Sequence, residues 1–356
     1  MTTINTARLT RSGLMVKNDE DLGFLVFSPY TGLIHAIHEK LSLSVEKWLN
    51  KSSKVTVPDS IVNALGPGWK VNISDGVFTS PHLLPEKSTW TWVNPPRFPI
   101  VVNWLITGNC PLECKYCFAE DLMRDERNEP DIKQLQQTAK SILHLNPLVV
   151  VLTGGDPLMS PHLEFIITTL AGKVGIIIDT SAYVLSNKHI KLFKRHKVVV
   201  RISIDSERPK KGHEAQRVLY RKYTGSRKRG STLTAALSGL CSCLDAGVSV
   251  TVQTVATKKT ANDLMGLGDK LFKLGVGFWR IFKVAPSKAN MSNYLRLVGK
   301  RYDNDKPVHG KASRGPYEHI FKMIQGAHNF HWKKKMAIQT SQSTSPNAVI
   351  LVSPDG

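Results

Sequence analysis

Six short runs rich in valine and isoleucine recur between residues 98 and 290 of this 356-residue chain. Most are separated by stretches of helical length, in which apolar residues recur at helical spacing. Strands that alternate with helices predict an α/β fold with a parallel sheet built from βα units. Six units rather than eight predict a partial (β/α)6, TIM-like barrel. The expected strands are residues 100–107, 149–153, 175–180, 198–205, 248–256 and 278–285, and the expected helices include 131–145, 163–171, 231–246 and 261–274.

The segments on either side of this pattern predict two further parts of the chain. Residues 1–95 are expected to form a small α+β unit, with a hairpin of strands 24–27 and 33–37 and short helices over 43–49 and 60–65. The barrel is then expected over 96–295 and a C-terminal extension over 296–356, with a helix at 317–325 and a strand at 347–352. The chain ends on a turn sequence, Ser-Pro-Asp-Gly, so we expect a further C-terminal segment in the natural protein.

Composition excludes several classes of protein. A hydrophobic content of 41% can bury a large core, which excludes global disorder. No apolar run approaches the ~18 residues of a membrane span, and the N-terminus lacks a signal-peptide core, so we expect a cytoplasmic protein. Five cysteines do not make a disulfide scaffold. Two of them, Cys241 and Cys243, fall in an expected helix and are interpreted as structural.

The other three cysteines, Cys110, Cys114 and Cys117, fall within eight residues directly after the first expected strand. The carboxyl ends of barrel strands are where such α/β proteins build their active sites. Three thiolates on one loop can hold three irons of a [4Fe–4S] cluster and leave the fourth iron open. There are two alternatives. One is a structural zinc site, which needs a fourth ligand that the neighbouring sequence does not offer. The other is three inert thiols.

The spacing Cys-x-x-x-Cys-x-x-Cys, with Tyr116 before the last cysteine, resembles the signature of the radical S-adenosylmethionine (radical SAM) enzymes. Residues 153–157, Thr-Gly-Gly-Asp-Pro, resemble the family's Gly-Gly-Glu-Pro motif at the end of the second strand. The resemblance implies that Gly154, Gly155 and Asp156 meet the amino group of the cofactor's methionine part. Asp156 stands where Glu is common and still supplies an acceptor.

Two later strand ends extend the resemblance, which covers about residues 98–290. Ser181 follows the third strand, where the family often has Thr-Asn-Gly. Ser203 and Asp205 belong to a Ser-x-Asp-Ser segment after the fourth strand, and Arg217 lies fourteen residues after Ser203. In relatives, the Ser and a following Arg contact the methionine carboxylate and the ribose. The alternative for Arg217 is one more member of the basic run over residues 208–229.

The resemblance implies two cofactors, a [4Fe–4S] cluster and S-adenosylmethionine (SAM), and an external electron donor of the flavodoxin or ferredoxin type. Reductive cleavage of SAM would give a 5′-deoxyadenosyl radical that abstracts hydrogen from a substrate. An alternative from another class is a non-catalytic iron–sulfur protein used for sensing or electron transfer.

The N-terminal unit is the best indication of a substrate. Its hairpin and helix are similar in outline to the leader-binding element of peptide-modifying radical SAM enzymes, including the SPASM/twitch-like branch, which implies a peptide or protein substrate captured at a sheet edge. The net charge of +20 would favour an acidic leader. Residues 208–229 hold nine Lys or Arg and one acid, so an RNA-modifying or nucleotide-modifying enzyme is an alternative. An extension that merely caps the barrel is the other interpretation of the unit.

Overall fold

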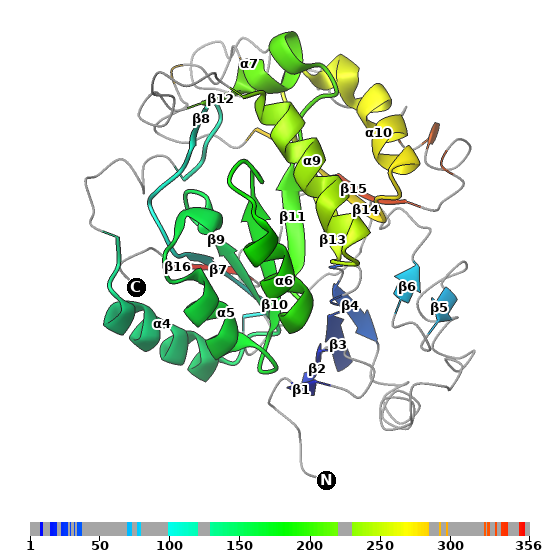
Figure 1. The fold of residues 1–356 in the computed structure, drawn as a ribbon. Coiled ribbons are helices and arrows are strands. Elements are labelled where there is room, and N and C mark those ends of the chain that lie inside the picture. Colours follow the sequence, from blue (N-terminus) through cyan, green and yellow to red (C-terminus); the bar gives the residue numbers. More distant parts are fainter. Residues whose placement is uncertain are drawn as a thin grey trace, which may run out of the picture.

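A parallel sheet of eight strands forms the centre of the molecule (Figure 1). The computed structural model describes residues 99–119, 129–219 and 230–284, together with the short segments 8–9, 15–19, 23–27, 29, 32, 34–37, 70–72, 77–79, 292, 297, 324, 326–327, 332, 336–340 and 349–352. The strand order is β15-β14-β13-β11-β10-β9-β7-β16, and all neighbours are parallel. Within these described segments the two edge strands do not pair, so the sheet is an open partial barrel.

Six of these strands confirm the runs expected from the sequence. The two edge strands come from the last part of the chain, and β16 falls within the strand expected over 347–352, whereas β15 was not predicted. The bounds are β7 Val101–Leu105, β9 Val149–Thr153, β10 Gly175–Thr180, β11 Val199–Ser203, β13 Val250–Ala256, β14 Phe278–Lys283, β15 Ala337–Thr340 and β16 Val349–Val352.

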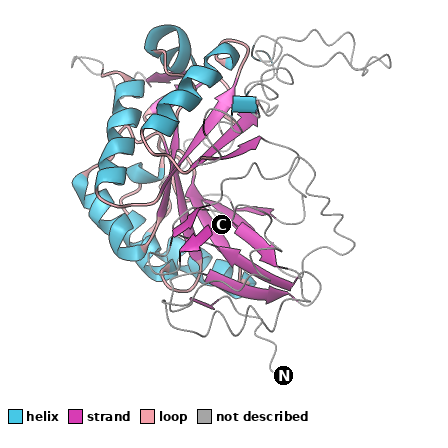
Figure 2. Ribbon diagram, turned by 90° about the vertical axis from the view of Figure 1, so that its right-hand side faces the viewer, coloured by secondary structure: helices cyan, strands magenta, loops and turns pink. Residues whose placement is uncertain are grey.

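Helices follow most of the strands and line one side of the sheet (Figure 2). Four of them confirm the expected helices, and α6 fills the connection between β10 and β11, for which no helix bounds were predicted. The bounds are α4 Ile132–Leu145, α5 Leu163–Leu170, α6 Asn187–His196, α9 Thr232–Asp245 and α10 Leu264–Lys273. Short helical turns lie at Pro157–Met159, Pro209–His213, Glu214–Gln216 (α7) and Ala261–Asp263.

Local hydrogen bonds explain where these helices begin. Asp131 caps α4 by accepting from the Gln134 backbone N–H at 2.8 Å, and the Gln134 side chain accepts from the Asp131 N–H at 2.9 Å. This reciprocal pair satisfies two donors that a helix N-terminus otherwise leaves free. Ser186 and His189 form the corresponding box at the start of α6.

The two faces of the sheet bury different partners. Side chains such as Val150, Ile178 and Val200 alternate along the strands with Val151, Ile177 and Val199. The first set packs in the core shared with the helices, and the second set packs on the other face with Met15, Leu25 and Phe27 of the N-terminal strands. This inner face is buried at the amino ends of the strands, which explains why the strands are apolar on both sides.

The N-terminal strands form a separate four-stranded antiparallel sheet, β1 Arg8–Leu9, β2 Met15–Asp19, β3 Gly23–Phe27 and β4 Ile34–Ile37. The expected hairpin is confirmed, because β3 and β4 pair with Phe27 opposite Ile34. Two strands, β5 Lys70–Asn72 and β6 Val77–Thr79, form a further ribbon. The helices expected over 43–49 and 60–65 lie outside the described residues, as does most of the helix expected over 317–325. No described helix has the length and apolar character needed to cross a lipid bilayer.

Candidate active site

The cysteine loop and the glycine loop meet at the carboxyl ends of β7 and β9. The Gly155 N–H donates to the Thr107 carbonyl and the Asp156 N–H to the Asn109 carbonyl, both at 2.8 Å. Gly154 adopts φ of +128°, and a Cβ there would lie 2.4 Å from the Thr107 carbonyl oxygen. At Gly155 a Cβ would lie 1.9 Å from the Asn109 oxygen. Both glycines are therefore required for the close approach of the two loops.

Asp156 is almost fully buried and already saturated by donors of its own chain. One carboxylate oxygen accepts from the Leu158 N–H at 3.2 Å and the Thr180 hydroxyl at 2.7 Å. The other accepts from the Ser181 N–H at 3.0 Å and the Ser181 hydroxyl at 2.5 Å. A carboxylate offers about four lone-pair positions. Asp156 thus ties the ends of β9 and β10 together, and it would have to exchange one of these donors to accept from a cofactor amine.

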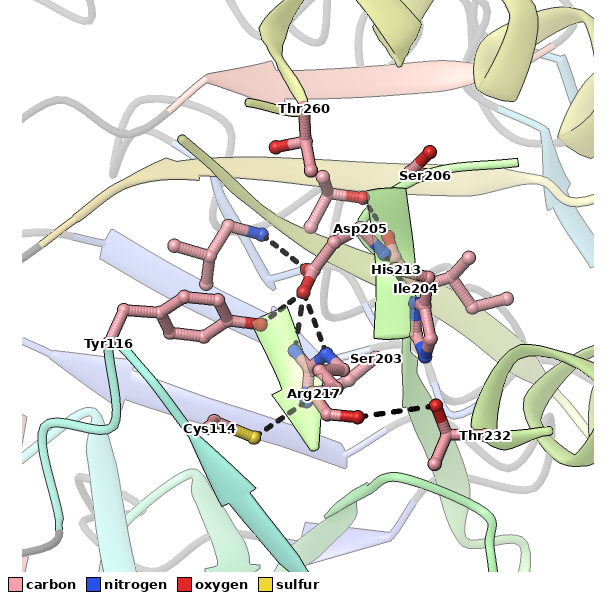
Figure 3. Close-up of polar contacts among 12 residues, drawn as sticks. Cys114, Tyr116, Ser203, Ile204, Asp205, Ser206, His213, Arg217, Thr232 and Thr260 are labelled. Carbon is pink, nitrogen blue, oxygen red and sulfur yellow. Dashed lines mark hydrogen bonds and ion pairs between the residues drawn. The ribbon is translucent and has the colours of Figure 1, made fainter. Parts of the chain in front are cut away.

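A second polar cluster forms around Asp205 at the end of β11 (Figure 3). Arg217 donates to it from Nε at 2.8 Å and from Nη2 at 3.4 Å, and the Tyr116 hydroxyl donates to the same carboxylate. The guanidinium also lies 5.5 Å from the centre of the Tyr116 ring. Arg217 and Asp205 are both buried. Arg217 is therefore directed into the interior of the site.

A short antiparallel ribbon brings Arg217 to the cysteine loop. Strand β8, Leu112–Cys114, pairs with β12, Arg217–Leu219, so that Arg217 lies opposite Cys114. Arg217 Nη1 lies 3.8 Å from the Cys114 sulfur. One guanidinium thus bridges the carboxylate of β11 and the middle cysteine, and Figure 3 shows it between the two.

The backbone around Asp205 is fixed by two further contacts. The Asp205 N–H donates to Nδ1 of buried His213 at 3.1 Å, and the Val255 N–H of β13 donates to the Asp205 carboxylate at 3.0 Å. Burial, together with the nearby Arg217, lowers the pKa of His213 to about 4, although Asp205 acts in the opposite direction. His213 is therefore neutral at pH 7 and can accept from the backbone through Nδ1.

The three thiols are free of disulfides and partly exposed. Burial raises the pKa of Cys114 to about 12, although Arg217 acts in the opposite direction, and burial and Asp156 raise the pKa of Cys110. Cys110 and Cys114 are therefore protonated at pH 7 until iron binds. Iron must displace the protons when it binds, as at other thiolate sites.

The residues present fit a cluster better than a single ion. Among the side chains that the structure describes, no three His, Cys, Asp or Glu lie close enough together to hold one metal ion. A [4Fe–4S] cluster needs no such convergence, because each thiolate binds a different iron. The cationic Arg217 beside Cys114 suits a cluster made anionic by thiolates.

The structure brings the predicted residues into two groups rather than one. Cys114, Tyr116, Asp205 and Arg217 share the Asp205 cluster, and Asp156 and Ser181 share the other. Buried Ser203 joins neither group directly, because its hydroxyl accepts from Gln253 of β13 at 3.0 Å.

Sequence reasoning missed Glu129, which supports the cysteine loop. Its Oε2 accepts from the Thr107 hydroxyl at 2.8 Å and the Asn109 amide at 2.7 Å. Its Oε1 is buried and, among the described residues, has no hydrogen-bond partner. Residue 129 precedes a helix cap and belongs to no motif, so no local signal could have found it.

Comparison with known proteins identifies the central part of the chain. Residues 104–268 match the Radical SAM superfamily, and this range includes both loops and both polar clusters. The chain contains a radical SAM domain. This superfamily uses a [4Fe–4S] cluster and SAM, which agrees with the thiols on the loop after β7.

Two sequence relatives and one solved structure are similar to this chain. An AdoMet-dependent heme synthase of Nitratidesulfovibrio vulgaris is 22% identical over 238 residues, 63% of this chain and 61% of that protein. A SAM-dependent nucleotide dehydratase of Fibrobacter sp. is 25% identical over 52% of this chain and 56% of that protein. Streptococcus suis SuiB, solved bound to precursor peptide SuiA, superposes with a TM-score of 0.58 at 11% identity over 94% of this chain and 73% of that one. The chain thus matches about three fifths of the length of the two curated relatives.

The Arg217–Asp205 pair predicts a large stability effect. Arg217→Gln should lower the free energy of unfolding by about 3–5 kcal/mol, because it leaves a buried carboxylate without its cation. Urea unfolding measures this. The matched control is Lys188→Gln, whose partner Glu164 lies at 2.9 Å with side chains 78% and 50% exposed, and it should change stability by less than about 1 kcal/mol. Equal effects of the two substitutions would contradict the buried pairing.

The lowered pKa of His213 predicts a pH dependence of stability. An unfolded histidine titrates near 6.5, whereas His213 in the folded protein titrates at about 4. Between these values only the unfolded chain gains the proton, so the free energy of unfolding should fall as pH drops from 6.5 to 4, by up to about 3 kcal/mol. His213→Gln should remove this part of the dependence, and His144→Gln, at an exposed position of α4, should retain it. An unchanged pH profile in His213→Gln would show that this histidine does not titrate as described.

Proposed function

We propose that the protein is a radical SAM enzyme that cleaves SAM reductively and abstracts hydrogen from a peptide or protein. The observation that carries the proposal is the loop of three thiols held against Arg217, Asp205 and the glycine loop. A cluster and SAM, when bound there, supply a 5′-deoxyadenosyl radical for hydrogen abstraction.

The residues of this chain take distinct parts in the proposal. Cys110, Cys114 and Cys117 hold the cluster, and Tyr116 orients the loop through its hydrogen bond to Asp205. Gly154, Gly155, Asp156 and Ser181 shape the adjoining wall, and Ser203 keeps a hydroxyl proton for a ligand because it accepts, rather than donates, its bond to Gln253. The Arg217 guanidinium already contacts the Asp205 carboxylate and the Cys114 sulfur, so its main role is to position the cysteine loop.

The peptide class is supported by two observations. The N-terminal strands form a sheet whose last strand, β4, pairs with β3 on one side, and a sheet edge is a surface on which an extended peptide can add as a strand. SuiB, which was solved with its precursor peptide bound, superposes on 94% of this chain. The positive net charge would favour an acidic peptide over a basic one.

A nucleotide substrate is the second candidate, supported by the sequence match to a nucleotide dehydratase. Phosphate recognition predicts binding that weakens steeply with salt, whereas strand addition predicts a smaller dependence. An iron–sulfur protein without catalysis predicts no cleavage of SAM.

The test is an anaerobic assay of the iron-reconstituted protein with SAM and dithionite, followed by mass spectrometry for 5′-deoxyadenosine. We expect product from the wild type and at least about a hundredfold less from Cys114→Ala, because the loop then offers two thiolates instead of three. The matched control is Cys241→Ala, a partly exposed thiol on α9, which should retain both cluster and activity.

The same assay separates the candidate substrates. Peptides encoded beside the gene, nucleoside triphosphates and transfer RNA are added in turn, and a mass change is sought in each. A changed peptide supports the proposal, and a changed nucleotide or RNA moves the assignment to that class. A protein that holds four irons yet never forms 5′-deoxyadenosine would overturn the enzymatic proposal.

A further inference from the structure

Three charged side chains share the inner face of the sheet, apart from both clusters described above. Asp179 of β10 lies beside Arg201 of β11 in the strand register. Arg280 of β14 lies between Trp279 and Ile281, which pack in the core on the helix side, so Arg280 faces the inner side. All three lie nearer the carboxyl ends of the strands than Ile177 and Val199, the apolar residues against which the N-terminal sheet packs.

The three groups leave one positive charge without an anion. Arg201 Nη1 lies 3.1 Å from one oxygen of Asp179 and 3.3 Å from the other, with side chains 9% and 19% exposed. Arg280 forms no ion pair or hydrogen bond in the part of the chain that the structure describes, and its Nε is buried without a partner. Its guanidinium carbon lies 5.0 Å from the centre of the Phe282 ring. Two cations and one anion sum to +1.

The surroundings of Arg280 disfavour its charged form. Burial and the nearby Arg201 lower the pKa of Arg280 to about 9, although Asp179 acts in the opposite direction. An isolated buried charge is costly unless it is paired. Because the Arg280 side chain is partly exposed, an anion from outside can reach it.

Arg280 also lies next to the proposed cofactor wall. Gln253 of β13 is paired with Ser203 on one side and with Arg280 on the other. Neighbouring strands are about 4.8 Å apart, so Arg280 lies two strands, or about 10 Å, from Ser203 at the same level of the sheet. A group bound by Arg280 would stand beside a ligand at Ser203.

We propose that Arg280, backed by the Arg201–Asp179 pair, is a binding site for one carboxylate of the peptide substrate. The inference rests on the proposed peptide function. The planar guanidinium fork matches a carboxylate, and a single negative charge cancels the surplus. A phosphate dianion would instead give these three side chains and the ligand a net charge of −1. The carboxylate belongs to an acidic side chain or to the peptide C-terminus.

The experiment measures binding of short probes by ligand-detected NMR. Ac-Gly-Glu-Gly-NH2 carries a side-chain carboxylate, Ac-Gly-Gln-Gly-OH a terminal one, and Ac-Gly-Gln-Gly-NH2 none. Arg280→Gln should weaken binding of at least one carboxylate probe about tenfold or more, because a hydrogen bond to a charged group contributes at least a decade in affinity. The preferred probe identifies the source of the carboxylate. The matched control is Arg195→Gln, at an exposed position of α6, which should bind as the wild type does.

Stability and cofactor binding separate a binding role from a structural one. Arg280→Gln should unfold at the same or a higher urea concentration, because it removes an unpaired buried charge and leaves Arg201 on Asp179. Its affinity for SAM should be unchanged. Equal carboxylate affinity in Arg280→Gln and wild type would overturn the inference. A loss of SAM affinity as large as the loss of carboxylate affinity would also overturn it. So would tighter binding of guanosine monophosphate than of either carboxylate peptide. A wild-type protein that binds the carboxylate probes but does not cleave SAM would instead count against the proposed function.

Discussion

The buried ion pair between Arg217 and Asp205 is the interaction on which the site depends. It joins the end of β11 to the ribbon that carries Cys114, and Asp205 and Cys114 are 91 residues apart in the chain. Coulomb attraction alone does not make such a pair favourable, because both charges lose their hydration. Here the Tyr116 hydroxyl and the Val255 N–H complete the bonding of the carboxylate, and the Cys114 sulfur receives a remaining donor of the guanidinium. The cysteine loop is thus positioned before any cofactor binds.

The parallel sheet explains why the polar groups gather where they do. Its strands are covered by helices on one face and by the N-terminal sheet on part of the other, so their central residues are apolar on both sides. The charged side chains of these strands therefore lie at the carboxyl ends and on the part of the inner face beyond the described N-terminal strands. Asp156, Ser203 and Asp205 occupy strand ends, and Arg201 and Arg280 occupy the inner face.

Most of the architecture could be predicted from the sequence, because hydrophobic periodicity is a local signal. The six strands and four helices followed from it, and the cysteine and glycine loops followed from their motifs. The inward direction of Arg217 could not be predicted, since it lies in a run of basic residues and its strand is only three residues long. The saturation of Asp156 by Thr180 and Ser181 also needed the fold, because these partners come from the next strand. Glu129 and Arg280 had no motif at all, and their roles arise only from long-range packing.

The most direct test of the account is the electron paramagnetic resonance spectrum of the dithionite-reduced, iron-reconstituted protein, recorded with and without SAM. We expect a spectrum typical of a reduced [4Fe–4S] cluster, and we expect SAM to change that spectrum because one iron lacks a protein ligand. A cluster spectrum that SAM leaves unchanged, or a protein that binds iron without forming a cluster, would contradict the claim that the three cysteines present an open iron to SAM.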